Sequence, residues 1–123
     1  MKSQINSLED AFKAQGIDPL VRPEVSDLPE IDQKQTVRNF ELDVLVRALN
    51  SEGLDKTWVP DYSNGNELKY EHCYFHSSAS GWSLHFVGHW SANARCSSRR
   101  VFRTPEIAND AWDRFSELFK AVL

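Results

Sequence analysis

The sequence predicts an α+β fold: N-terminal helices, an antiparallel β-meander of about three strands, and a C-terminal amphipathic helix packed on the sheet. Two stretches, one from about residue 32 and one after residue 104, repeat apolar residues at three- and four-residue steps, which indicates amphipathic helices. From residue 69 to residue 90 the period changes to two and aromatic residues become frequent, which indicates strands.

Length and composition predict one globular domain over residues 1–123. The chain has a mass of 14.1 kDa, with 41% hydrophobic and 26% charged residues, which are ordinary values for a globular protein. No apolar run approaches the ~20 residues that a membrane helix needs, so no membrane partner is expected. Glu9 and Asp10 lie in a first segment without an apolar stretch, which does not resemble a signal peptide. We therefore expect a cytoplasmic protein whose two cysteines are free thiols.

Residues 1–31 are predicted to hold a short helix and a proline-rich connector. The helix is expected near Ser7–Gln15, because Ser7 and Asp10 resemble a capping box and Gly16 is a natural stop. Prolines at positions 19, 23 and 29 then exclude a continuous helix and predict an extended connector.

Two longer helices are predicted, over residues 32–52 and residues 104–122. Gly53 lies just past the end of the first. Thr104 can cap the second, Pro105 suits its first position, and Glu106 complements the helix dipole. This last helix has one wide apolar stripe, which we expect to pack on the apolar face of the sheet.

The sheet is predicted over residues 69–103 and begins with a hairpin. With residues 78–81 as the turn, Ser77 would face Trp82 and Cys73 would face Phe86. The predicted apolar face then holds Cys73, Phe75, Trp82, Leu84 and Phe86. The opposite face holds Tyr70, His72, Tyr74, His76, Ser83, His85, Val87 and His89. A third strand is predicted over Arg95–Arg103.

The polar-aromatic face is the main candidate for binding a protein partner, because tyrosine, tryptophan and histidine combine large contact area with polar groups. The candidate partner-binding residues are Trp58, Asp61, Tyr62, Tyr70, Tyr74, His76, His85 and Trp90, with Arg95 and Arg99 at the rim. The alternative is that the second helix or the connector covers this face and makes it a second core layer. An open aromatic sheet is also compatible with a homodimer.

A basic run gives a second hypothesis, which is nucleic-acid binding through Arg95, Arg99, Arg100 and Arg103. Against it stands the net charge of −4, and an edge strand protected by charged residues explains the same run.

A small metal-dependent enzyme is the third hypothesis. His72 and His76, like His85 and His89, are four residues apart, but on a strand this spacing separates them by roughly 13 Å. Cys73 is expected on the other face, and no nucleophile elbow, P-loop or dinucleotide fingerprint is present. The sequence therefore predicts no catalytic residue, no metal ligand and no cofactor, and the protein is expected not to be an enzyme.

Several stretches resemble small proteins of bacteriophages and mobile elements, especially those of Bacteroidetes. These stretches are LEDAFKAQGIDP, PEVSDLPE, ALNSEGLDKTWVPDYSNGNELKY and SSRRVFRTPEIANDAWDRFSELFKAVL. They include the element Trp58, Pro60 and Asp61, and the run Ser97, Ser98 and Arg99. Where relatives are rich in tyrosine, proline and phenylalanine, this chain has residues 71–74, Glu-His-Cys-Tyr, so a histidine metal site is not implied. The resemblance implies an accessory protein in the cytoplasm of a bacterial host that binds a host, defence or phage protein.

Overall fold

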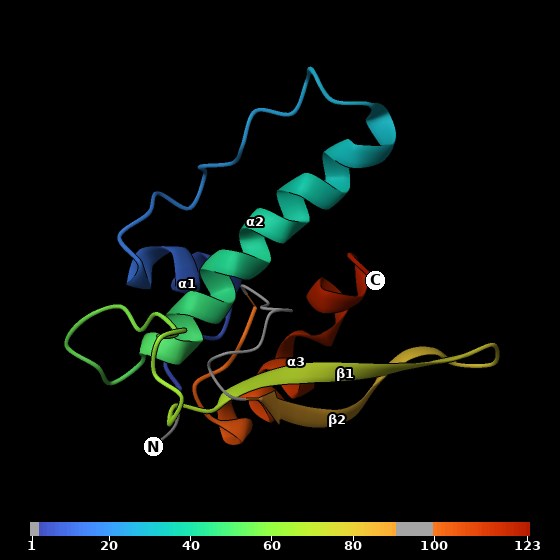
Figure 1. The fold of residues 1–123 in the computed structure, drawn as a ribbon. Coiled ribbons are helices and arrows are strands. Elements are labelled where there is room, and N and C mark those ends of the chain that lie inside the picture. The colour runs from blue at the N-terminus through green and yellow to red at the C-terminus, as the bar shows by residue number, and fades with distance from the viewer. Residues whose placement is uncertain (1–2, 91–99) are drawn as a thin grey trace.

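The computed structural model describes residues 3–90 and 100–123. In chain order the elements are α1 (Leu8–Ala14), α2 (Glu30–Ser51), β1 (Lys69–Ser77), β2 (Gly81–Trp90) and α3 (Pro105–Lys120). The helix α2 packs between α1 and α3, and the β1–β2 hairpin packs on α3 (Figure 1). The predicted α+β class is therefore confirmed, with a two-stranded antiparallel sheet in the described part of the chain.

The helices begin at the predicted caps. Ser7 accepts a hydrogen bond from the Asp10 backbone N–H at 3.1 Å, and Thr104 accepts one from the Ile107 N–H at 3.1 Å. Gly16 follows α1 with a φ of +70°, which glycine adopts without steric cost. Of the three helices in the described part of the chain, α2 begins without a side-chain cap, directly after Pro29. These local signals explain why the helix bounds agree with the predictions to within about two residues.

The hydrophobic core lies where the three helices meet. Phe12 of α1, Leu45 of α2 and Phe119 of α3 are almost completely buried in it. All the buried residues of α2 lie in its C-terminal half, whereas its N-terminal half extends away beside the connector (Figure 1). Burial of this apolar area is the main stabilising contribution to the fold.

An ion-pair cluster fastens the proline-rich connector to the helices. The Arg22 Nε donates to the buried Glu41 carboxylate at 2.9 Å, and Arg38 pairs with the same carboxylate at 3.2 Å. The Arg22 guanidinium also lies 4.5 Å from the centre of the Phe12 ring. Between α1 and α2 the connector contains no helix, as predicted, and Arg22 joins it to both helices.

The predicted third strand is not where a meander would place it. Most of that strand lies outside the described residues, but Phe102 forms an isolated β-bridge with Tyr70 of β1. The Phe102 N–H donates to the Tyr70 carbonyl at 2.7 Å, and the Tyr70 N–H donates to the Phe102 carbonyl at 3.1 Å. A meander would pair this segment with β2 instead. The segment lies beside β1 because Asn50 of α2 binds it. The Asn50 Nδ2 donates to the Val101 carbonyl at 2.8 Å, and the Asn50 Oδ1 accepts from the Arg103 N–H at 2.7 Å. This contact holds the segment on the β1 side of the hairpin.

The predicted hairpin register is correct at the base and wrong by one residue at the tip. Gly81, with a φ of +77°, pairs with Ser77, so the turn is shorter than predicted. The register then shifts because His85 has no partner on β1, and the predicted Cys73–Phe86 pair is formed. As a result Trp82 and Leu84 lie on the same face as Tyr74 and His76, not on the face of Phe75.

The face covered by α3 is therefore the opposite of the predicted one. The centre of the His72 ring lies 4.9 Å from that of Phe119 and 5.8 Å from that of Trp112. The ring centres of Tyr74 and Trp112 lie 5.3 Å apart. Among the described residues, α2 contacts α1 and α3 but neither strand. Thus α3, and not α2 or the connector, covers the tyrosine-histidine face, because β2 adds Trp82 and Leu84 to that face.

Candidate interaction surface

The side of the hairpin that faces away from α3 is an aromatic surface, which we call the outer hairpin face. It consists of Glu71, Cys73, Phe75, Ser83, Phe86 and Gly88. Phe75 and Phe86 are each 54% exposed, although both are large apolar residues. The Phe86 ring lies against Gly88, where an added Cβ would stand 3.3 Å from Phe86 Cε2 and 3.1 Å from Cys73 Sγ. Because glycine has no Cβ at position 88, the Phe86 ring can pack directly against the backbone of β2.

One histidine ring, that of His85, borders Phe75 and Phe86 on the outer hairpin face. His85, the unpaired residue of β2, lies 5.2 Å from Phe86 and 6.0 Å from Phe75. On the other face His76 and Trp82 make a ring contact at 4.9 Å. The tip of the hairpin projects beyond the helices (Figure 1). Both faces of this end of the hairpin are therefore accessible to a partner, and their aromatic rings carry polar groups that can form hydrogen bonds.

At the base of the hairpin a loop covers the end of the outer hairpin face. Tyr62 stacks on Trp90 with ring centres 5.9 Å apart. Beneath them Lys69 is fully buried, and its Nζ donates to the Asp61 and Glu67 carbonyls at 2.6 and 3.0 Å. The same Nζ forms an ion pair with the Glu67 carboxylate at 3.1 Å. The loop is thus folded around one buried ammonium group.

Two other predicted residues belong to this loop region. Asp61 accepts hydrogen bonds from the Ser63 side chain and backbone, and these bonds lower the pKa of its carboxyl. The backbone N–H of Trp58 donates to Ser51 at 2.8 Å. Trp58, Pro60 and Tyr62 line a hollow of about 350 Å³ against α2, together with Val59, Asp43, Val46, Arg47, Asn50 and Val101. This volume is at the lower end of the range for small-molecule sites.

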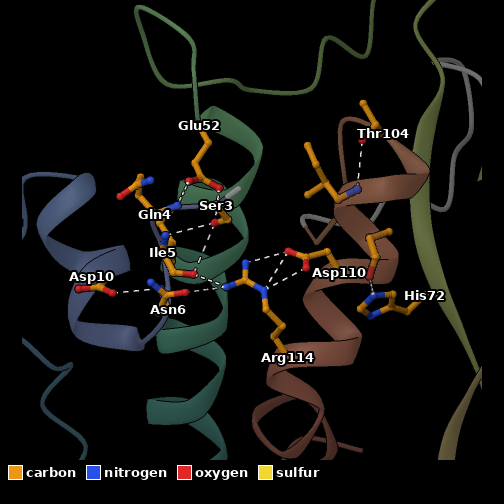
Figure 2. Close-up of polar contacts among 12 residues, drawn as sticks. Ser3, Gln4, Ile5, Asn6, Asp10, Glu52, His72, Thr104, Asp110 and Arg114 are labelled. Atoms are coloured by element: carbon orange, nitrogen blue, oxygen red, sulfur yellow. Dashed lines mark hydrogen bonds and ion pairs between the residues drawn. The ribbon is translucent and has the colours of Figure 1, made fainter. Parts of the chain in front are cut away.

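A larger hollow of about 580 Å³ lies between the N-terminal segment, the end of α2 and the start of α3. Figure 2 shows how its polar residues contact one another. Glu52 accepts hydrogen bonds from the Ser3 hydroxyl at 2.6 Å and the Gln4 N–H at 2.8 Å. Arg114 pairs with Asp110 at 2.7 Å and donates to the Ile5 carbonyl at 2.5 Å. These groups join three segments of the fold.

The tyrosine and histidine closest to α3 have structural partners. The carbonyl of Ala108 accepts from His72 Nε2 at 2.7 Å (Figure 2), so the Tyr74 hydroxyl donates to Nδ1 at 2.9 Å. Burial lowers the pKa of His72 and raises the pKa of Tyr74 to about 12. A neutral imidazole and a neutral phenol therefore link the hairpin to α3. Tyr70 makes a ring contact with His89 at 5.9 Å.

The structure divides the predicted partner-binding residues into three groups. Trp58, Asp61, Tyr62 and Trp90 lie at the base of the hairpin, and His76 and His85 lie exposed at its tip. Tyr70 and Tyr74 are half-buried. Arg95 and Arg99 lie outside the described residues. Sequence reasoning missed Phe75 and Phe86 as surface residues, and the signal that could have found them is Gly81, which favours the shorter turn.

The basic run has structural contacts where it is described. Arg100 donates to Asn39 at 2.7 Å and pairs with Asp43 at 3.3 Å, and Arg103 donates to the Asn50 carbonyl at 2.8 Å. Both arginines therefore bind α2, whereas the predicted nucleic-acid site needs them on an exposed row.

The described residues show no cluster of three or more His, Cys, Asp or Glu side chains that could hold a metal ion. Cys96 lies outside this part of the chain. Over the same ranges, no helix combines the length and the apolar character needed to cross a membrane.

No family model, curated protein or solved structure matches the chain.

Proposed function

We propose that this chain is a non-catalytic accessory protein of a phage or mobile element that binds a host or defence protein through its hairpin. The observation behind this proposal is the exposure of Phe75 and Phe86, 54% each, on a hairpin that projects beyond the helices (Figure 1). Exposed apolar patches bordered by polar residues mark interaction sites, and aromatic residues often dominate the binding free energy.

The binding surface of this proposal is the outer hairpin face together with His85. It keeps His85 from the predicted set and adds the two phenylalanines. It omits Tyr74, because that side chain contacts Trp112 and bonds to His72. A binding role needs no catalytic group, and His72, the histidine nearest the core, is neutral and bonded on both ring nitrogens.

The test is a double variant, Phe75→Ser with Phe86→Ser, compared with the wild type by quantitative co-purification from the bacterial host. We expect one host protein to be retained by the wild type and lost with the variant. Binding of that purified protein should then weaken by about 30-fold or more for the double variant, since an aromatic hot spot contributes ~2 kcal/mol.

The matched control is Leu20→Ser with Ile31→Ser. These residues are 87% and 85% exposed, and they lie on the connector and at the start of α2, away from the hairpin. The control should bind the partner as the wild type does. Equal binding by all three proteins would exclude the hairpin as the binding surface. Retention of nucleic acid alone, lost at moderate salt, would favour the nucleic-acid hypothesis instead.

A further inference from the structure

In residues 3–90 and 100–123, β2 forms the edge of the sheet that lies away from Phe102. Because Phe102 bonds to Tyr70, the segment that would complete the sheet lies on the β1 side. No described residue outside the hairpin forms a backbone hydrogen bond with β2. In Figure 1, β2 lies below β1, and the first turn of α3 lies near the C-terminal end of β2. A strand edge of this kind exposes a row of N–H and C=O groups that can pair with another strand.

The side chains of β2 provide no charge and no proline to protect this edge. Its ten residues, GWSLHFVGHW, include no Asp, Glu, Lys, Arg or Pro. Natural proteins commonly place charges or proline on edge strands to prevent pairing between molecules. The one interruption in β2 is the bulge at His85.

The positions of the outward backbone groups follow from the Tyr70–Phe102 bridge. Tyr70 uses its N–H and C=O for Phe102, so its pair with His89 is a non-hydrogen-bonded pair and the His89 groups point outward. Along β2, residues whose backbone groups bond to β1 alternate with residues whose backbone groups point outward, and the bulge at His85 adds one residue to this alternation. The outward positions are Trp82, Leu84, Val87 and His89.

Successive outward positions of β2 are two, three and two residues apart, and this pattern is the same in both chain directions. A regular strand laid on β2 would lose register at the bulge. A second copy of β2, antiparallel to the first, would place one bulge opposite the other and keep both halves in register. Trp82 would then face His89 of the second copy, and Leu84 would face Val87, which are aromatic and aliphatic pairs.

We propose that two copies of this chain form a dimer with two-fold symmetry through the outer edge of β2. The two hairpins become one four-stranded antiparallel sheet with strand order β1–β2–β2–β1. The two Phe86 side chains lie on either side of the symmetry axis, and the two outer hairpin faces form one continuous surface. Two-fold symmetry is the commonest arrangement of homo-oligomers, and a self-complementary strand edge satisfies it directly.

The test is the mass of the full-length protein in solution, measured by light scattering during size-exclusion chromatography. We expect twice 14.1 kDa at a chain concentration on the order of 100 μM. Leu84→Lys should raise the dissociation constant at least ~10-fold, because each dimer gains two charges at the paired edge. Ser83→Lys is the matched control, since its backbone pairs with Phe75 and its side chain lies on the outer hairpin face.

Hydrogen exchange of the wild type keeps the test independent of how the variants fold. The backbone amides of Leu84 and Val87 should become protected as concentration rises, while those of Ser83 and Phe86, already bonded to β1, should not change. A monomeric wild type would overturn the inference. So would a dimer that Ser83→Lys weakens as much as Leu84→Lys, or a dimer without new protection on β2.

Discussion

At the scale of single residues, buried polar groups join segments that are far apart in the chain. His72 connects β1 to the Ala108 carbonyl of α3, and Asn50 of α2 binds both Val101 and Arg103. Lys69 organises the loop at the base of the hairpin. Each of these groups is paired, as buried polar groups must be if they are not to cost stability.

We expect the stability of the protein to decrease as the pH falls below about 6.5. Burial lowers the pKa of His72 from its ordinary value of 6.5, so the unfolded chain takes up a proton at a higher pH than the folded chain. The free energy of unfolding therefore declines as pH decreases from 6.5 toward the lower pKa of the folded state. Urea denaturation at a series of pH values measures this decline.

The variant His72→Phe should reduce that pH dependence, because it removes the buried titrating group while keeping an aromatic ring beside Phe119. The exposed His85 supplies the control, and His85→Gln should retain the decline seen in the wild type. If His72→Phe shows the same pH dependence as the wild type, His72 is not its source.

Replacement of Asn50 should destabilise the protein strongly. Asn50→Ala removes two hydrogen bonds at a buried site and leaves the Val101 carbonyl and the Arg103 N–H without these partners. We expect a loss of about 2–3 kcal/mol in the free energy of unfolding, measured by urea denaturation. Asn109→Ala, at an exposed position of α3, should change it by less than about 0.5 kcal/mol. Equal effects of the two variants would contradict the role of Asn50.

At the scale of secondary-structure elements, one turn decides which hairpin face is covered. The shorter turn at Gly81 and the bulge at His85 move Trp82 and Leu84 to the side of Tyr74. A shift of one residue in a strand exchanges its faces, so a small local difference changes the surface of the whole element. This explains why the hairpin itself was predicted correctly while the exposure of Phe75 and Phe86 was not.

We expect Gly81→Ala to destabilise the hairpin by about 1–2 kcal/mol. Gly81 has a φ of +77°, and no atom lies within 4 Å of an added Cβ, so the cost comes from the backbone conformation alone. Gly65→Ala is the matched control, because that glycine has equal space and no positive φ. Thermal denaturation of both variants checks the prediction, and an unchanged Gly81→Ala protein would argue against the observed turn.

At the scale of the whole molecule, the helices form the core and the hairpin is the exposed element. The helix α3 lies between α2 and the strands and supports one side of the hairpin (Figure 1). On the other side, the described residues leave Phe75 and Phe86 exposed. This arrangement gives the proposed partner a surface that is separate from the residues that stabilise the core. Dimerisation through β2 would double that surface and allow two partners to bind at once.

The sequence by itself determined the α+β class, the helix bounds, the hairpin and the Cys73–Phe86 pair. These features depend on local periodicity and on caps such as Ser7 and Thr104, which act within a few residues. Only the tertiary structure decided which face α3 covers and which strand lies beside Phe102. These features depend on an unpaired residue at position 85 and on side-chain contacts such as that of Asn50, which span 51 residues of the chain. Contacts of that range leave no periodic signal in the sequence, because they arise only when the packed elements meet.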